Sequence, residues 1–419
     1  MFKDKLIKHR EAMSNFIWRL LQLVSKQGVT LLIFLLSARM LPPYEFGTYN
    51  YALAIIFFLI MFGDFGISTA TSKYIAEYNV TNKDKLRLVL FNSTLMILSL
   101  TLIIAIFTLL FGRAYLGGIY PYVFYLFPLI FLAPMTSLYD GIYRGVKNFK
   151  KLAIISLSTS IISLSFIYLF IKNYGLVGAL VSQNLFYLIL LLSLAVGYRK
   201  FSFKLDKDII KEIGSYSFVI GMAGIGYYLF TRINVIILGH FGYITELGYY
   251  ELINKVFALL LLPFTILSQV ISPSITGLYS KNRNKEVVVK YKEYLIFSFV
   301  VGFVIAIFTF FTFPFILKNF LSQYYNNVTL TIMNLLLIIL VTQCMSSIAS
   351  FGFSTSTGHA KLNMYFLLFF GIVNIPLSIL FLKLWGFMGI IYSTLIVKFL
   401  ADVSFIISYY VIIKKSIVI

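Results

Sequence analysis

Apolar runs of about 20 residues recur along the whole chain and constrain its fold more than any other feature, because a helix of that length crosses the hydrocarbon core of a bilayer. Charged residues make up only 12% of the 419 residues, so little of the chain remains for a soluble catalytic domain. We therefore predict an all-α membrane protein with about 12 transmembrane helices. The predicted spans are 16–41, 47–71, 88–112, 119–143, 152–172, 176–198, 213–239, 247–273, 292–318, 327–354, 362–383 and 388–413.

Basic residues fall mainly on one side of these spans. If the N-terminus is inside, the inner segments hold 25 of the 35 Lys and Arg residues, whereas the outer loops hold only Arg113, Lys172, Lys318 and Lys383. Basic residues accumulate on the cytoplasmic side of membrane proteins. We therefore expect a multi-pass protein of the plasma (inner) membrane with both termini in the cytoplasm. The net charge of +20 follows this topology and predicts contact with membrane lipids, not with nucleic acid.

Two short motifs recur between the halves of the chain. Glu45-Phe-Gly-Thr-Tyr49 returns as Glu246-Leu-Gly-Tyr-Tyr250, and Lys172-Asn-Tyr-Gly175-Leu-Val-Gly178 returns as Lys383-Leu-Trp-Gly386-Phe-Met-Gly389. Both copies of each motif lie on the same side of a six-span unit, so the repeat is parallel, with its pseudo-twofold axis along the membrane normal. We predict two six-helix lobes, at residues 1–205 and 206–419.

Four basic side chains lie inside the predicted spans, away from the loops: Lys26, Arg232, Lys255 and Lys398. A Lys or Arg at the centre of a lipid-facing helix costs roughly 2.5 to 3.5 kcal/mol. Such residues face a polar cavity or a partner. The four bases therefore predict a translocation cavity with positive potential, suited to an anionic cargo.

Two carboxylates offer another explanation for two of these bases. Glu251 precedes Lys255 by four residues, which is the favourable order for an ion pair on a helix, and Asp402 follows Lys398 by four. Both lysines are thus candidates for internal ion pairs as well as for cargo binding. Lys26 and Arg232 have no such neighbour and are the stronger candidates, with Glu251 as an additional member of the cavity.

The remaining intramembrane acids support no catalytic or metal site. Asp64, flanked by Gly63 and Gly66, is a candidate for coupling to an H⁺ or Na⁺ gradient, or a partner for Lys26 or Lys73. Asp140 and Arg144 are one helical turn apart, which favours a structural ion pair. Cys344 is the only cysteine, and no group of Cys, His and carboxylate residues has the spacing of a metal site, so we expect no cofactor.

Several motifs, in this order, resemble the polysaccharide flippases of the MOP (multidrug/oligosaccharidyl-lipid/polysaccharide) exporter superfamily, the Wzx-type O-antigen and capsule transporters. The likeness covers nearly the whole chain. The motifs are Arg39-Met-Leu-Pro-Pro-Tyr-Glu-Phe-Gly-Thr-Tyr49, Gly63-Asp-Phe-Gly-Ile67, Gly141-Ile-Tyr-Arg-Gly145, Arg232-Ile-Asn-Val-Ile-Ile-Leu-Gly239 and Leu247-Gly-Tyr-Tyr250.

This resemblance implies a MATE-like transporter, not an enzyme, that moves a polyprenyl-diphosphate-linked oligosaccharide from the cytoplasmic to the outer leaflet by alternating access. It implies an electropositive central cavity, and polysaccharide polymerase and glycosyltransferases as functional partners. Many relatives carry Asp where this chain has Asn234, so ion coupling at that position is in doubt. The alternatives are a cation-coupled multidrug exporter of the same superfamily and a peptidoglycan-precursor flippase. A membrane glycosyltransferase would need a longer extramembrane loop than this chain has.

Overall fold

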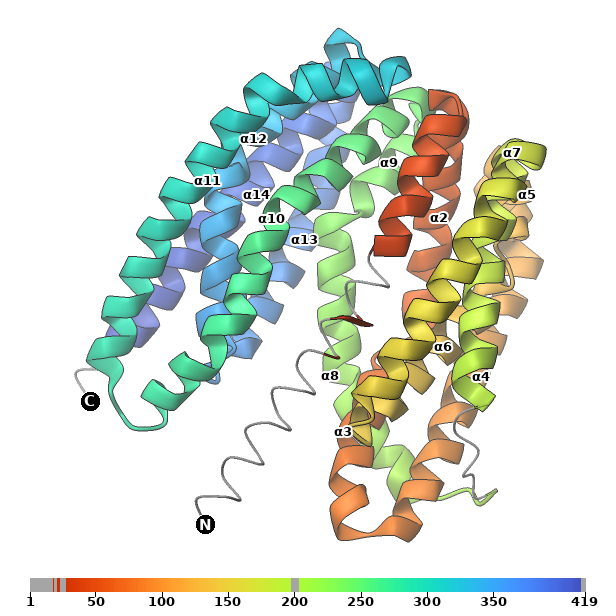
Figure 1. The fold of residues 1–419 in the computed structure, drawn as a ribbon, viewed down its shortest axis with the longest axis vertical. Coiled ribbons are helices and arrows are strands. Elements are labelled where there is room, and N and C mark those ends of the chain that lie inside the picture. Colours follow the sequence, from red (N-terminus) through yellow and green to blue (C-terminus); the bar gives the residue numbers. More distant parts are fainter. Residues whose placement is uncertain (1–17, 19–20, 23–27, 197–202, 416–419) are drawn as a thin grey trace. The chain divides into compact units, whose positions relative to one another are not determined.

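The computed structural model describes residues 18, 21–22, 28–196 and 203–415. Within these residues the chain is helical and contains no strand, so the predicted all-α membrane fold is confirmed (Figure 1). Nine of the described helices are long and apolar enough to cross a membrane. The chain divides into two compact units, residues 1–224 and 225–419. This division lies inside a helix, downstream of the predicted boundary at residue 205, and the extents of the two lobes stay a prediction.

Unit 1 contains the helices that correspond to the first six predicted spans and the beginning of the seventh. Each of spans two to six overlaps one to three of these helices, and the helix Gly28–Met40 covers the later part of the first. They are Gly28–Met40, α2 (Pro43–Asp64), α3 (Ile67–Thr81), α4 (Lys83–Leu116), η1 (Gly117–Ile119), α5 (Tyr120–Tyr125), α6 (Leu129–Gly145), α7 (Phe149–Val196) and most of α8 (Lys207–Thr231).

Unit 2 contains the end of α8 and the remaining helices. The seventh predicted span corresponds to α8 and α9, and the tenth to an α-helix that continues as a π-helix, η3. The elements after α8 are α9 (Ile233–His240), α10 (Ile244–Tyr279), α11 (Asn284–Phe320), η2 (Ser322–Tyr324), α12 (Asn327–Ser347), η3 (Ile348–Ser354), α13 (Ala360–Trp385) and α14 (Phe387–Lys415).

Three predicted spans are broken where the backbone cannot continue as a helix. Between α2 and α3, Phe65 (φ 38°) and Gly66 (φ 80°) both adopt left-handed conformations. Between α5 and α6 the chain turns at residues 126–128, and Pro128, which has no backbone N–H to donate, precedes the first residue of α6. Between α8 and α9, Arg232 departs from helical geometry with φ −127°. These breaks place Asp64 and Arg232 at helix ends.

The glycine motif of the predicted repeat has the same backbone geometry in both units. Gly175 has φ 53° and ψ −129°, and its counterpart Gly386 has φ 59° and ψ −147°. Three residues later, a Cβ on Gly178 would lie 2.0 Å from the carbonyl oxygen of Phe170, and a Cβ on Gly389 would lie 2.0 Å from that of Phe381. Glycine is required at these positions because the chain packs back on the preceding helix.

The second repeated motif also makes an equivalent contact in each unit. The Nε2 atom of Gln183 donates to the hydroxyl of buried Tyr49 at 2.5 Å in unit 1. In unit 2 the hydroxyl of buried Tyr250 lies 3.5 Å from the Oγ1 atom of Thr394. Tyr250 and Thr394 are the counterparts of Tyr49 and Gln183 in the two motif registers. The contact thus joins α2 to α7 in unit 1 and α10 to α14 in unit 2.

We predict that Gly389→Ala destabilises the protein, since the new methyl group overlaps a backbone carbonyl that has little room to move. Such overpacking costs about 1–3 kcal/mol, occasionally more. Gly277→Ala, on α10 of the same unit, is the control because its Cβ would have no atom within 4 Å. Thermal unfolding in detergent, followed by intrinsic fluorescence, should show a lower midpoint for Gly389→Ala alone. Equal midpoints for the two variants would contradict this explanation of the repeated glycine.

Candidate anion-binding site

Three of the predicted intramembrane bases lie close together in unit 2. Arg232 occupies the break between α8 and α9, Lys255 lies on α10, and Lys398 lies on α14. The charges of Arg232 and of Glu251 act on both lysines. Asp402, also on α14, acts on Lys398. We call these five residues, Arg232, Glu251, Lys255, Lys398 and Asp402, the charged cluster.

Arg232 forms a salt bridge with Glu251. The Nη1 atom of Arg232 lies 2.5 Å from the Oε2 atom of Glu251. The carboxylate is buried, with 6% of the side chain exposed, whereas 46% of the arginine side chain is exposed. Glu251 therefore forms its salt bridge with a base on a neighbouring element. One acid, Glu251, thus compensates one of the two positive charges of Arg232 and Lys255.

Lys398 is the member of the cluster whose charge has the least direct compensation. It is half-buried and, among the described residues, forms no salt bridge, although Asp402 is one turn away. Its Nζ atom lies 5.7 Å from the centre of the Phe257 ring on α10, a cation–π contact. The Asp402 carboxylate instead accepts a hydrogen bond from the Oγ1 atom of Thr342 on α12 at 3.4 Å. The ion pair considered for Lys398 and Asp402 is not formed.

The cluster therefore carries three cations and two carboxylates. Both carboxylates are buried, with 4% of Glu251 and 6% of Asp402 exposed. Lys255 and Lys398 are half-buried, and Arg232 is the most exposed of the five. With all groups ionised the net charge is positive, and the exposed part of the cluster is basic. Its chemistry suits an anion that carries more than one negative charge.

A buried network of uncharged polar side chains holds the elements around the cluster. The Nδ2 atom of Asn234 donates to the Oγ1 atom of Thr394 at 2.8 Å. The Oδ1 atom of Asn234 accepts from the Oγ atom of Ser378 at 3.0 Å and from the Nδ2 atom of Asn374 at 3.3 Å. Ser378 also lies 2.8 Å from Ser393. The network connects α9, which begins next to Arg232, to α13 and to α14, one turn before Lys398.

Asp64 lies in unit 1 and lines a cavity of about 370 Å³ at the break between α2 and α3. Its Oδ1 atom accepts hydrogen bonds from the backbone N of Ser68 at 2.9 Å and from the Ser68 hydroxyl at 2.6 Å. Its Oδ2 atom accepts one longer bond, 3.3 Å, from the Ser137 hydroxyl. Thr69 and Tyr187 add further hydroxyl groups to the lining. The cavity thus offers a carboxylate with spare acceptor capacity.

Lys73 is not the partner of Asp64. Its Nζ atom lies 4.1 Å from the centre of the Tyr216 ring and 4.7 Å from that of Tyr74, where α3 packs on α8 within unit 1. The other partner considered, Lys26, lies outside the described residues, so its predicted place in the translocation cavity stays a prediction.

The predicted pair of Asp140 and Arg144 is confirmed. The Nε atom of Arg144 lies 2.8 Å from the Oδ1 atom of Asp140. The Oδ2 atom of the same carboxylate accepts a hydrogen bond from the Nε2 atom of Gln22 at 3.0 Å. Asp140 therefore has a structural role, since it ties the first predicted span to α6.

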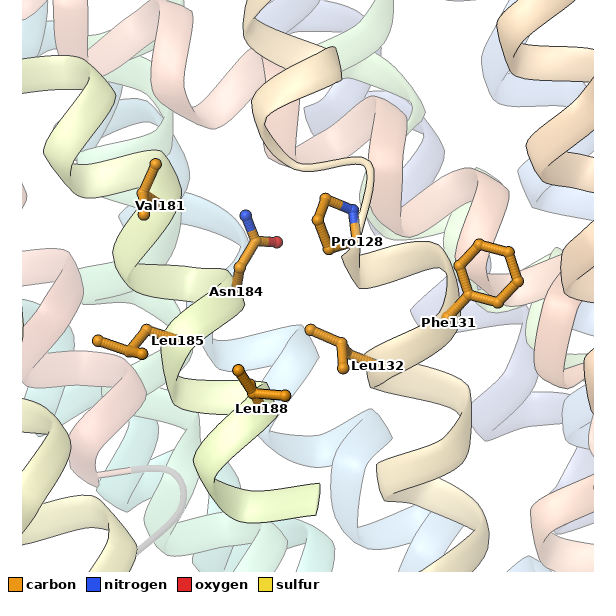
Figure 2. Close-up of a pocket in the computed structure, with 7 residues that line it drawn as sticks. All are labelled: Pro128, Phe131, Leu132, Val181, Asn184, Leu185 and Leu188. Carbon is orange, nitrogen blue, oxygen red and sulfur yellow. The ribbon is translucent and has the colours of Figure 1, made fainter. Parts of the chain in front are cut away.

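A second hollow in unit 1, of about 440 Å³, carries no charge. Figure 2 shows that one wall comes from α7 and the other from the turn at Pro128 and the start of α6, with Asn184 extending toward Pro128. The Nδ2 atom of Asn184 donates a hydrogen bond of 2.6 Å to the carbonyl of Tyr125. This carbonyl lies at the end of α5, just before the break. The lining is Pro128, Phe131, Leu132, Val181, Asn184, Leu185 and Leu188. The apolar lining suits hydrocarbon, not a charged head group.

Sequence reasoning missed the polar network and the contact of Asp402 with Thr342 on α12. A signal for the network was present, since Asn374 and Ser378 are four residues apart on an otherwise apolar span and Ser393 and Thr394 follow on the next. Spacing along one helix identifies a shared face, but it does not reveal which other helix that face meets. The same limit explains why Glu251 was considered a partner of Lys255 and not of Arg232.

Comparison with known proteins gives the family. The profile of the polysaccharide biosynthesis protein family matches residues 12–279, which is more than half of the chain. The chain belongs to the polysaccharide biosynthesis protein family. The matched region includes Asp64, Arg232, Glu251 and Lys255, and it ends before Lys398. No curated protein sequence matches the chain.

Solved structures give the fold of this family member. An inward-facing multidrug resistance MATE family transporter of the MOP superfamily matches with a TM-score of 0.80 and 15% identity over 95% of this chain and 98% of that one. A mutant of the Vibrio cholerae MATE transporter VcmN matches with a TM-score of 0.66 and 13% identity over 97% of both chains. The predicted MATE-like fold is confirmed. Family and fold together identify a membrane protein with a MOP-superfamily transporter fold.

One match differs in the polarity of its site. A MOP superfamily transporter from Pyrococcus furiosus, described by a reverse polarity of its binding pocket that suggests a different function, matches with a TM-score of 0.63. Its identity is 16%, over 96% of this chain and 94% of that one. At this identity the likeness concerns the fold alone.

We predict that Asn234→Ala destabilises this family member, because it removes three interhelical hydrogen bonds from a buried network. Such bonds contribute about 0.6 kcal/mol each in membrane proteins, so we expect a loss of about 2 kcal/mol. The control is Asn319→Ala, since among the described residues that exposed side chain bonds to the carbonyl of Phe315 within its own helix. Unfolding in detergent should separate the two variants. Equal stability would mean that the network does not hold α9 in place.

Proposed function

We propose that this protein moves a lipid-diphosphate-linked oligosaccharide from the cytoplasmic to the outer leaflet of the plasma membrane by alternating access, for cell-surface polysaccharide export. The observation that supports the proposal most is the charged cluster of unit 2. In this cluster Lys398, which has no salt bridge among the described residues, lies near an exposed arginine, and both belong to predicted apolar spans. Membership of the polysaccharide biosynthesis protein family supports the same cargo class.

The chemistry of the cluster fits a diphosphate better than a neutral or cationic ligand. A phosphate group carries between one and two negative charges near neutral pH and offers several strong acceptor oxygens. Arginine can bind such oxygens through two donors, whereas lysine acts as a mobile point charge. Arg232 is therefore the orienting contact, and Lys255 and Lys398 supply attraction. None of these contacts encloses the head group, which a transporter must release.

Three further features belong to this proposal. The positive-inside pattern places both termini in the cytoplasm, where the cargo is assembled. Glycosyltransferases would supply the lipid-linked oligosaccharide, and a polymerase would use it after transfer. A peptidoglycan-precursor flippase would use the same diphosphate chemistry with a different head group.

A cation-coupled multidrug exporter is the second candidate function, and the cavity around Asp64 favours it. A carboxylate with spare acceptor capacity in a cavity of about 370 Å³ is a feature that suits an organic cation. The same carboxylate is the candidate for coupling flipping to an H⁺ or Na⁺ gradient. The two candidate functions therefore assign Asp64 either to the cargo or to the coupling ion.

We predict that Lys398→Gln lowers the rate of lipid-linked oligosaccharide transfer about 10- to 100-fold, since a charge-assisted hydrogen bond contributes about 1.5–3 kcal/mol. The measurement is transfer of a fluorescent lipid-linked sugar across liposomes that contain the purified protein. Lys383→Gln is the control, because that lysine lies at the end of α13 in a predicted outer loop. Wild-type transfer by Lys398→Gln, or export of cationic drugs with no lipid-sugar transfer, would contradict the proposal.

We predict that Asp64→Asn removes the response of transfer to an imposed proton or sodium gradient while downhill transfer continues. The amide retains the shape of the side chain and can still accept from Ser68, but it cannot take up a proton or balance a cation. The liposome assay with and without each gradient measures this effect. A variant that responds to both gradients like the wild type would show that Asp64 is not the coupling residue.

A further inference from the structure

Glu251 is held in an asymmetric and incomplete way. Its Oε2 atom contacts Arg232 at 2.5 Å, whereas its Oε1 atom is fully buried and has no hydrogen-bond partner among the described residues. Buried polar atoms in proteins are almost always paired, so an unpaired carboxylate oxygen requires an explanation. An acid in this position is not in its best environment. It is therefore more easily displaced from Arg232 than a fully bonded carboxylate.

Arg232, by contrast, is open to a ligand. The salt bridge uses its Nη1 atom, and 46% of its side chain is exposed while Glu251 is 6% exposed. Guanidinium has five N–H donors in a planar fork. A phosphate can therefore approach the free side of the fork without first moving Glu251. Its oxygens then compete with the carboxylate for the same charge.

The displaced carboxylate has a second base within reach. Lys255 lies one turn further along α10, with the acid first, and the charges of Glu251 and Arg232 already act on it. If Glu251 leaves Arg232, it can turn toward Lys255 on its own helix without moving the backbone. The ion pair with Lys255 expected from the sequence is thus available as the alternative state.

We propose that Glu251 is an internal counter-ion, which occupies Arg232 when the site is empty and gives way only to a multiply charged anion such as a diphosphate. Glu251 is then a specificity-determining residue for the cargo. This inference rests on the proposed function, because it requires a phosphate-bearing ligand at the charged cluster.

The selectivity follows from charge. A monocarboxylate that replaces Glu251 on Arg232 exchanges one carboxylate contact for an equivalent one and leaves a buried acid to be paired again. A diphosphate brings additional negative charge, which Lys398 and Lys255 can also attract. Glu251 therefore lowers the affinity for a monocarboxylate more than the affinity for a diphosphate. Competing contacts of this kind produce specificity.

The test compares ligand binding by the purified full-length protein and by Glu251→Gln, using calorimetric titration with inorganic pyrophosphate, farnesyl diphosphate and acetate. Glutamine keeps the size of the side chain but removes the charge that competes for Arg232. We expect Glu251→Gln to bind a diphosphate ligand about tenfold more tightly than the wild type, and acetate, undetectable in the wild type, to bind as well. A gain in affinity for farnesyl diphosphate but not for inorganic pyrophosphate would identify a lipid-linked diphosphate as the ligand.

Three matched variants separate this role from a structural one. Glu246→Gln removes an acid from the first turn of the same helix and should bind like the wild type. Adding Arg232→Gln to Glu251→Gln should abolish the gain, since the contested base is then absent. Glu251→Ala provides a second neutral side chain if the glutamine variant is too unstable to purify. If a neutral variant of Glu251 loses stability but keeps the wild-type preference for diphosphate over acetate, the effect is structural. That result would overturn the counter-ion role of Glu251.

The titrations also distinguish failure of the counter-ion role from failure of the proposed function. If the wild type binds a diphosphate and Glu251→Gln binds neither diphosphate nor acetate more tightly, the counter-ion is wrong and the proposed function stands. If neither the wild type nor Glu251→Gln binds pyrophosphate or farnesyl diphosphate, both the proposed function and the inference are overturned.

Discussion

The cost of placing charge among apolar helices governs the arrangement of unit 2. Arg232, Lys255 and Lys398 lie on separate elements that are rich in apolar residues, where each base requires a partner or a polar surrounding. The structure compensates one base by a salt bridge to Glu251 and places another over an aromatic ring. The remaining acid, Asp402, faces α12. Positive charge is thus reduced but not cancelled, and the surplus makes the cluster suitable for an anion.

Uncharged contacts supply the rigidity that this charge arrangement needs. Asn234 connects α9 to α13 and α14 through side chains that are all buried, so the elements that carry Arg232 and Lys398 are joined without any further charge. The repeated glycines fix where α13 turns into α14, and the same device recurs at Gly175 in unit 1. In unit 1, the charged residue that lines the described cavity is a carboxylate, that of Asp64.

Most of the fold was predictable because membrane spans are defined by local composition. Spans two to twelve all correspond to described helices, and the repeated motifs that indicated two lobes have the same glycine backbone geometry in both units. The breaks at Phe65 and Arg232 were not predicted, since hydropathy is continuous through both. In the site, Arg232, Lys255 and Lys398 were identified from the cost of buried charge, but their partners were not. Asp140 and Arg144 were paired correctly because both lie on one helix.

The sequence by itself determined the helical class, the approximate positions of the spans, the internal repeat and the set of charged residues within the apolar runs. These properties depend on the length and period of apolar runs, which a chain carries locally. The tertiary structure alone decided that Glu251 meets Arg232 while Lys398 meets Phe257. Those contacts join residues on different helices, and their energies depend on helix packing within unit 2, which no spacing along a single helix encodes.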